Sequence, residues 1–363
     1  MQKVKMLTFH NAENYGAMLQ AYALKETIKK LGMNPQFINY ENEKILSDYK
    51  LIRTNSLKSF FSSLWYMPRN LKRKRSFKSF SNKYLDTKTK VYTSPEEIEK
   101  DIKPCDIFVS GSDQIFNPSL TGGLSDVYTL NFKTKENIKK IIYGASLGNE
   151  ELLKKHALDF KEKLESIEHI SVREQNIISP LESIVKKDIT QVLDPTLLLD
   201  KSDWENLILQ NDKVSLPKEK YILVYTLFES KEVTKVANYL SKITGLKVVH
   251  FRKYNAYQNE LKSLYKYGPV DFVNAVSNAA YVITNSFHGT VFSIIFERKF
   301  YSVLPKERAG RIKDLLTTLN LNDRIIQDEN QIDSNRNIDY ITVKSKIECL
   351  KTESIEFLKK GVD

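Results

Sequence analysis

Short apolar stretches alternate with amphipathic stretches along most of the chain. Lys3–Phe9 is typical of a buried strand, and residues 17–31 follow with apolar side chains at helical spacing, ending at Gly32. Gln36–Tyr40 is a second apolar stretch of strand length. The sequence therefore predicts a strand–helix–strand start, which is the repeating unit of a parallel sheet.

The alternation continues through the first half of the chain. Residues 44–100 are expected to be helical or irregular, and a helix is predicted over about 151–167. The further strands are predicted at Asp106–Ser110, Ile141–Ala145, Ile170–Val172 and Gln191–Leu193. This half therefore predicts one doubly wound α/β domain.

The same pattern begins again after a boundary near residues 194–203. Strands are predicted at Tyr221–Leu227, Lys247–Phe251, Ala280–Thr284 and Phe300–Val303, with helices over about 231–243, 271–279 and 311–319 and from about Thr290. We therefore expect an α/β fold of two Rossmann-like domains that face each other across a cleft. The expected division is 1–200, with a basic helical insertion at about 44–100, then 201–341, and a terminal helix at 342–363 that crosses back to the first domain.

Composition excludes several classes of protein. With 41% hydrophobic and 28% charged residues the chain is globular rather than disordered. No apolar run approaches the roughly 18 residues of a membrane span, and the start lacks the apolar region of a signal peptide. Cys105 and Cys349 cannot form a disulfide framework. These features predict a cytoplasmic protein.

The net charge of +11 is concentrated in one segment. Residues 50–90 hold twelve Lys and Arg against one acid, Asp86, so the rest of the chain is neutral. Within it, residues 57–78 place aromatic and aliphatic side chains beside dense basic charge, which indicates peripheral binding to an anionic membrane at its inner face. A surface helix packed on its own domain, or a guide for an acidic glycan, remains open. No nucleic-acid motif accompanies the charge, so no nucleic-acid partner is expected.

Unusual polar stretches follow the predicted strands. Ligands of open parallel sheets bind outside the carboxyl ends of the strands, where loops lead into helices. The stretches are His10–Gly16, Gly111–Gln114, Gly144–Gly148, Arg173-Glu174 and Asn285–Thr290. We expect them to form one ligand site, although turns of α/β proteins also need such residues.

His288 is the strongest single candidate. It is expected just before a helix N-terminus, where backbone N–H groups favour an anion and an imidazole adds a proton donor. Asp113 is a candidate general base towards a hydroxyl. The alternatives are a histidine that caps its own helix and an aspartate that caps a turn.

Two arginines could bind an anion. Arg173 ends a predicted strand and could grip a carboxylate or phosphate, or pair instead with Glu174 or Asp194. Arg311 lies at the start of a predicted helix, where an anion is also favoured.

Most standard catalytic motifs are missing. The chain has no G-x-G-x-x-G, no P-loop and no metal-ligand spacing, so neither a cofactor nor a metal is expected. Gly144–Gly148 fits the G-x-S-x-G nucleophile elbow of hydrolases, with a plain turn as the alternative.

In their order along the chain, the polar loops resemble the polysaccharide pyruvyl transferase family. The residues that carry the resemblance are Thr8–Asn11, Asn14–Ala17 and Leu19-Gln20, then Gly111–Gln114, Tyr143–Gly148, Ser171–Glu174, Asp194–Leu198, Gly268-Pro269 with Phe272, Ser286–Gly289, and Arg311, Leu315-Leu316, Leu319, Leu321 and Asp323-Arg324. The resemblance runs from about residue 3 to 325.

This resemblance implies two Rossmann-like domains arranged as in GT-B glycosyltransferases. It implies phosphoenolpyruvate as donor and a ketal of pyruvate on two hydroxyls of a glycan, in cell-surface or exopolysaccharide biosynthesis. Arg173 matches a donor-binding arginine and His288 a catalytic histidine, whereas Ser286 replaces an arginine of the family pattern. We expect Arg311 to substitute for it.

The resemblance also assigns roles. His288 would be the general acid, Asp113 the base, and Arg173 would neutralise the donor. The residues expected to bind the donor are Asn14, Gly16, Gly111, Ser112, Arg173, Ser286, His288, Gly289 and Arg311. The acceptor would be a glycan or a lipid-linked glycan. Two other functions remain open, a GT-B-type glycosyltransferase that uses a nucleotide sugar and a non-catalytic glycan-binding protein.

Overall fold

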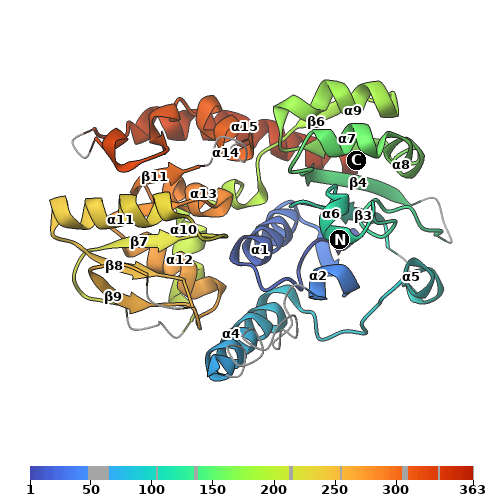
Figure 1. The fold of residues 1–363 in the computed structure, drawn as a ribbon. Coiled ribbons are helices and arrows are strands. Elements are labelled where there is room, and N and C mark those ends of the chain that lie inside the picture. Colours follow the sequence, from blue (N-terminus) through green and yellow to red (C-terminus); the bar gives the residue numbers. More distant parts are fainter. Residues whose placement is uncertain are drawn as a thin grey trace. The chain divides into compact units, whose positions relative to one another are not determined.

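The chain forms two compact units in the computed structural model, which describes residues 1–47, 65–103, 105–134, 138–211, 216–253, 256–304, 310–333 and 336–362. The first unit comprises the described residues of 1–50, 79–199 and 348–363, and the second those of 51–78 and 200–347. Each unit contains one sheet (Figure 1). The arrangement of the two domains across a cleft stays a prediction.

The first unit is built on a six-stranded parallel sheet with the order β2-β1-β3-β4-β5-β6. Its strands are β1 (Lys3–Leu7), β2 (Asn34–Phe37), β3 (Ile107–Ser110), β4 (Lys139–Ala145), β5 (His169–Val172) and β6 (Ile189–Gln191). Its α-helices are α1 (Tyr15–Lys30), α2 (Glu43–Ser47), α5 (Pro95–Asp101), α6 (Pro118–Thr121), α7 (Glu151–Lys155), α8 (Ala157–Lys163) and α9 (Ile178–Val185). This order is that of a doubly wound Rossmann-like domain.

The second unit repeats the architecture. Its six strands are parallel, in the order β12-β11-β10-β7-β8-β9. They are β7 (Tyr221–Tyr225), β8 (Lys247–His250), β9 (Glu260–Ser263), β10 (Tyr281–Thr284), β11 (Lys299–Val303) and β12 (Ile325–Ile326). The helices are α10 (Lys201–Leu209), α11 (Lys231–Thr244), α12 (Pro269–Asn278), α13 (Phe287–Ile295) and α14 (Gly310–Thr318). The predicted fold of two Rossmann-like domains is confirmed.

Two helices have residues in both units. The first, α4 (Met67–Phe80), belongs to the second unit up to Lys78, although its position in the sequence suggests an insertion of the first domain. The second, α15 (Tyr340–Val362), belongs to the first unit from Glu348 onwards. Among the described residues, none of the helices combines the length and the apolar character of a membrane span.

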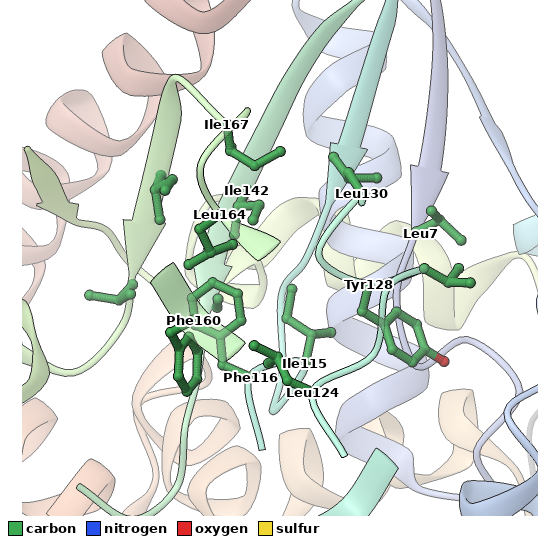
Figure 2. Close-up of a cluster of buried hydrophobic side chains, with 14 of the residues drawn as sticks. Leu7, Ile115, Phe116, Leu124, Tyr128, Leu130, Ile142, Phe160, Leu164 and Ile167 are labelled. Carbon is green, nitrogen blue, oxygen red and sulfur yellow. The ribbon is translucent and has the colours of Figure 1, made fainter. Parts of the chain in front are cut away.

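The core of the first domain follows from the alternation of side chains along buried strands. On one face, Leu7, Phe108 and Ile142 contribute to a cluster with helix and loop residues such as Phe116 and Phe160. Figure 2 shows part of this cluster, including Leu7, Ile142, Phe116 and Phe160. The ring centres of Phe116 and Phe160 lie 5.4 Å apart, edge to face. This packing covers one side of the sheet.

On the other face of β4, Tyr143 packs near Phe357 of α15, with ring centres 6.2 Å apart. Ser354 accepts a hydrogen bond from the backbone N–H of Leu193 at 2.9 Å. The end of the terminal helix is therefore part of the first domain's core.

The second domain has its own core on each face of its sheet. On one side, Val233 and Leu240 of α11 pack on strand residues such as Val224. On the other, Trp204 of α10 is fully buried against Phe292 of α13, with ring centres 4.8 Å apart. Because strands covered on both sides hold almost no polar side chains, the polar groups collect at their ends.

The predicted boundaries differ from the structure in a few places. Helix α13 begins at Phe287 rather than Thr290, because Ser286 caps it and accepts a hydrogen bond from Gly289 N–H. The predicted helix over 151–167 is two helices, α7 and α8, separated at His156. The half-exposed strand β9 was not predicted, since Glu260–Ser263 has no apolar pattern.

The two tryptophans of the chain give a matched test of the second core. We expect Trp204→Ala to lower the free energy of unfolding by about 3–5 kcal/mol, because it leaves a large cavity beside Phe292. Trp65→Ala is the control, since Trp65 is 82% exposed and its loss should change the value by no more than about 0.5 kcal/mol. Urea unfolding followed by circular dichroism measures both. Similar values for the two variants would contradict the described core.

Candidate functional site

Each sheet contains a topological switch point, which lies between two neighbouring strands whose connections to the next strand run in opposite directions along the sheet. In the first sheet it lies between β1 and β3, and in the second between β7 and β10. Ligands of open α/β sheets bind outside the carboxyl ends of the strands at such points. The predicted polar loops follow three of these four strands, β1, β3 and β10. Each domain therefore has its candidate residues where this fold class places its ligands.

At the first switch point a buried hydrogen-bond network connects the two neighbouring loops. Gln20 on α1 accepts from Ser112 N–H at 3.1 Å and donates to the hydroxyl of Thr8 at 2.8 Å. The hydroxyl of Thr8 donates to the carbonyl oxygen of Ser112 at 3.3 Å, and that of Ser112 donates to Gly144 O at 2.6 Å. The loop after β3 is therefore held on several sides before any ligand binds.

Gly111 and Asp113 shape this loop. Gly111 has φ +125°, and a Cβ there would collide with the carbonyl oxygen of Tyr143, so only glycine fits. Asp113 has φ +67°, a conformation that aspartate tolerates better than most residues. The loop therefore turns the Asp113 carboxylate towards β5, where it lies 3.6 Å from Arg173 Nη2.

Arg173 is the central charge of the first domain's edge. Its side chain is buried, its Nη1 donates to Asp194 Oδ2, and Nη2 faces Asp113. Asp194 is itself fixed by Thr196, whose N–H and hydroxyl both donate to Oδ1, at 3.0 and 2.6 Å. Of the alternatives left open by the sequence, the structure shows the pairing of Arg173 with Asp194.

The electrostatics of this cluster are dominated by acids. Burial by itself would lower the pKa of Arg173, but the carboxylates of Asp194, Asp113 and Glu174 outweigh it and raise that pKa above its ordinary value. The guanidinium is therefore always charged and already has two carboxylate partners. Three carboxylates around one cation give this edge a negative balance. The donor-binding role of Arg173 stays a prediction.

Glu174 and Ser146 form a second buried pair at the same edge. The hydroxyl of Ser146 donates to Glu174 Oε1, and both residues are buried. Among the described residues, Glu174 Oε2 is buried without a hydrogen-bond partner. A buried carboxylate oxygen in this state is a candidate acceptor for a substrate hydroxyl.

The same pair argues against a serine hydrolase. Ser146 follows the end of β4, its hydroxyl donates to a carboxylate rather than an imidazole, and the next helix, α7, begins only at Glu151. A nucleophile elbow needs a sharp strand-to-helix turn that exposes the serine. Gly144–Gly148 is therefore a plain turn at the end of β4, which is the alternative that the sequence left open.

Asn14 and Gly16 have a structural role that the sequence did not assign. Asn14 is the N-cap of α1, and its side-chain oxygen accepts from Gly16 N–H at 2.9 Å and Ala17 N–H at 3.3 Å. The side-chain oxygen of Asn14 and the N–H of Gly16 are thus bonded to each other at the start of α1. Their donor-binding role stays a prediction.

At the second switch point, Asn285 ties the two neighbouring loops together. Its side chain accepts from Leu227 N–H at 2.9 Å and donates to Phe228 O at 3.1 Å, both in the loop after β7. The backbone N–H of the adjacent Ser286 donates to the hydroxyl oxygen of Thr284 at 3.0 Å. The start of α13 is therefore fixed to the sheet edge.

His288 lies in the first turn of α13, one position inside the helix rather than just before it. It is buried, and its ring meets that of Phe287 edge to face at 5.3 Å. The guanidinium of Arg311, at the start of α14, lies 5.9 Å from the centre of the Phe287 ring. The described part of this edge thus gathers an imidazole, an arginine and the amide end of a nine-residue helix, groups that favour an anion.

Gly289 completes the turn, because a Cβ at this position would collide with the side chain of Thr284. The close approach lets the hydroxyl of Thr284 contact the helix start, so glycine is required here for packing. The predicted donor-binding residues Ser286, His288, Gly289 and Arg311 therefore lie together at one edge, whereas Asp113, Arg173, Gly111 and Ser112 lie together at the other.

The sequence analysis named the loops at these two edges but not all of the residues that organise them. Gln20 was named only as part of the family resemblance, and Asn285 only as a member of a polar stretch. Asp194 was named as one possible partner of Arg173, and its position after a strand predicted beside that of Arg173 was the signal for this ion pair. Among the described residues, no cluster of three potential metal ligands occurs.

His10, the first residue of the polar stretch after β1, lies in the core of the first domain. It is fully buried, with Nδ1 2.9 Å from the carbonyl oxygen of Thr8 and its ring packed against Phe37 at 5.2 Å. Burial lowers the pKa of His10 below its ordinary value. These contacts indicate a structural histidine.

A comparison of the sequence with known protein families finds a match. A family model described as polysaccharide pyruvyl transferase matches residues 14–306, a stretch that contains β3, β7 and β10 of the two switch points. No curated protein with significant sequence similarity was found.

Solved structures of similar fold include epimerases and a glycosyltransferase at low sequence identity. A UDP-N-acetylglucosamine 2-epimerase matches with a TM-score of 0.49 and 12% identity, over 97% of this chain and 90% of the other. The UDP-GlcNAc 2-epimerase of Neisseria meningitidis matches with 0.46 and 10%, over 100% and 94%. The glycosyltransferase SnogD from Streptomyces nogalater matches with 0.46 and 10%, over 98% and 95%.

The buried state of His10 predicts a pH dependence of stability. In the unfolded chain this imidazole takes up a proton below about pH 6.5, whereas in the folded state its pKa is lower. The free energy of unfolding should therefore fall as the pH drops from about 6.5 towards the folded pKa. His10→Gln should flatten this dependence by up to about 1.4 kcal/mol per pH unit. Urea unfolding between pH 7.5 and 5, roughly the window of this titration, measures it. Equal slopes for the two proteins would show that His10 titrates normally.

Proposed function

Since this chain belongs to the polysaccharide pyruvyl transferase family, we propose that it transfers pyruvate from phosphoenolpyruvate to two hydroxyls of a glycan sugar, as a ketal. The single observation that supports the proposal most is the cluster of His288, Ser286 and Arg311 at the switch-point edge of the second sheet. A proton donor beside anion-binding groups is what an enol phosphate requires. The glycan is proposed to be a cell-surface or exopolysaccharide precursor.

The donor is assigned to the edge of the second domain. Phosphoenolpyruvate carries a carboxylate and a phosphate, and the first turn of α13 offers amides at the positive end of a helix dipole. Arg311 supplies the charge that the family arginine would provide at Ser286. The first domain's edge suits this anion less well, because Asp194 and Asp113 already contact the guanidinium of Arg173.

His288 is assigned the role of general acid. Its ring gives a proton to the methylene carbon C3 of the enol, and C2 becomes an oxocarbenium-like centre. The oxygen of one sugar hydroxyl bonds to C2 and loses its proton to a base. The C2–O bond to phosphate then breaks with its electron pair, and the second hydroxyl bonds to C2, its proton leaving with the phosphate. A well-placed general acid contributes roughly 10²–10⁴-fold to such a step.

The base is assigned to the first domain, where carboxylates are in excess. Asp113 is the first candidate, since its backbone is held in a fixed turn and its side chain, 13% exposed, keeps some access to solvent. Glu174 is the second, through its oxygen Oε2. The anionic donor is repelled by these carboxylates, whereas a neutral sugar hydroxyl can bind beside them and give up its proton. The chemistry needs no metal in this scheme.

One incubation tests the proposal directly. The purified protein is mixed with phosphoenolpyruvate and a panel of glycans and lipid-linked glycans, and released phosphate and the mass of the glycan are measured. Phosphate release with the mass gain of a pyruvyl ketal supports the proposal. A melting temperature raised by uridine or guanosine diphosphate, with no response to phosphoenolpyruvate, would favour a nucleotide-sugar glycosyltransferase. No turnover with any donor would favour a glycan-binding protein.

His288→Ala should lower kcat by about 10²-fold or more, since the enol carbon then lacks its proton donor. Binding of phosphoenolpyruvate should change much less, because the helix amides and Arg311 remain. His156→Ala is the control, as His156 lies in the short break between α7 and α8 and pairs with Asp159. Steady-state phosphate release and calorimetric titration separate the two effects. Normal turnover of His288→Ala would move the acid to another residue.

The two arginines should respond differently to the same change. Arg311→Gln should weaken binding of phosphoenolpyruvate by about 1.5–3 kcal/mol, the value of a hydrogen bond to a charged group. Arg173→Gln should instead lower the free energy of unfolding by about 3–5 kcal/mol, because it leaves Asp194 buried without its counter-ion. Calorimetry and urea unfolding of both variants test this. An Arg173→Gln protein of normal stability with weak donor binding would make Arg173 the donor ligand.

A further inference from the structure

Helix α4 is fixed to the second domain through one side. Arg73 donates to the carbonyl oxygen of Tyr265 at 3.1 Å, and its guanidinium lies between the rings of Phe77 and Tyr265, 4.6 and 5.0 Å from their centres. Arg69 donates to the carbonyl oxygen of Lys253 at 3.0 Å. Two of the basic residues that the sequence suggested for a partner are thus used to attach the helix.

The other bases of α4 are open to solvent. Lys72, Lys74, Arg75 and Lys78 are exposed, and residues 65–78 contain no acid. Trp65, at the start of the same segment, is 82% exposed. The sequence placed part of the contact in residues 57–64, which lie outside the described residues.

The tertiary structure adds cations from two distant loops. The ammonium of Lys253 lies 4.5 Å from the centre of the Tyr66 ring. Those of Lys72 and Lys266 both lie 5.4 Å from the centre of the Tyr267 ring. Three segments of the chain therefore bring like charges and aromatic rings together, at a cost in repulsion that an anionic partner would relieve. We call Trp65, Lys72, Lys74, Arg75, Lys78, Lys253 and Lys266 the basic surface.

We propose that the basic surface docks the protein on an anionic lipid bilayer. From Lys72 to Lys78 the helix rises about 9 Å, and Lys74, Arg75 and Lys78 lie within about 100° of one another around its axis. With Lys253 and Lys266 they form a patch of charge suited to a plane of headgroups rather than to a single small ligand. Trp and Tyr are the residues enriched at membrane–water interfaces, and an exposed tryptophan at one end of a basic helix fits this boundary. The proposal concerns a surface separate from the donor edge and does not depend on the transferred group.

A lipid surface fits these observations better than a nucleic acid. Each base near an anionic leaflet contributes about 1 kcal/mol, which a helix with four exposed cations can use without any motif. Recognition of nucleic acid by a helix would instead require side chains that read base edges or stack on bases. The tyrosine rings here are already covered by cations of the protein itself.

The test uses co-sedimentation with vesicles of phosphatidylcholine alone or of equimolar phosphatidylcholine and phosphatidylglycerol. The protein should bind the anionic vesicles at low salt, and binding should weaken with salt because screening shortens the Debye length from about 10 Å at 0.1 M to about 3 Å at 1 M. Replacing Lys72, Lys74, Arg75 and Lys78 with Gln should lower partitioning at least about tenfold. Trp65→Ala should lower it as well, at unchanged charge.

The control variant removes the same number of exposed bases from elsewhere in the second domain. This variant replaces four exposed lysines with glutamine, at Lys220, Lys231, Lys235 and Lys242. It lowers the net charge by the same amount and should leave partitioning near the wild-type value. Equal loss in both variants would mean a nonspecific charge effect and would overturn the proposal. So would equal binding to neutral vesicles, or no binding to anionic ones. Phosphate release with a soluble acceptor shows separately whether the transferase proposal holds.

Discussion

Parallel strands that are covered on both faces impose the constraint on which this molecule depends. Their backbone groups are paired within the sheet, and their side chains must be apolar on both sides. Polar side chains can therefore gather only where the strands end. Both domains follow this rule, since β3 is buried along its length, β1 and β10 are buried at their carboxyl ends, and each leads into a polar loop. The location of the chemistry is thus a consequence of the fold.

The two edges nevertheless differ in charge. At the first, three carboxylates surround Arg173 and leave a negative balance. At the second, the amide end of α13 joins His288 and Arg311. The groups that we propose to remove a proton and those that we propose to hold the donor and give a proton therefore belong to different domains.

The basic segment shows how a local excess of charge can have two uses. Arg73 and Arg69 attach α4 to the second domain through carbonyl oxygens and aromatic rings, while Lys74 and Arg75 remain exposed. The helix thereby groups with a domain whose sheet begins well over a hundred residues later in the chain. Long side chains that pack along their stems and rings can do this without giving up the charge of the whole segment.

Much of the fold and the loops of the candidate site could be predicted from the sequence, because they depend on local pattern. Apolar stretches of strand length alternate with helical spacing, and turns need glycine, serine and asparagine. The strands from Lys3 to Val303 and the polar loops that follow them were found in this way. Strands β9 and β12 were missed because Glu260–Ser263 is only half buried and β12 has two residues.

What the tertiary structure alone decided are the partners of those residues. The pairing of Arg173 with Asp194, the bond between Ser146 and Glu174, and the position of Arg311 beside Phe287 each join segments that are far apart in the sequence. The same holds for Arg73 and Tyr265. A pattern of spacing records which face of its own helix or strand a side chain occupies. Which charge lies opposite depends on how helices and strands pack, and packing is fixed only when the whole chain has folded.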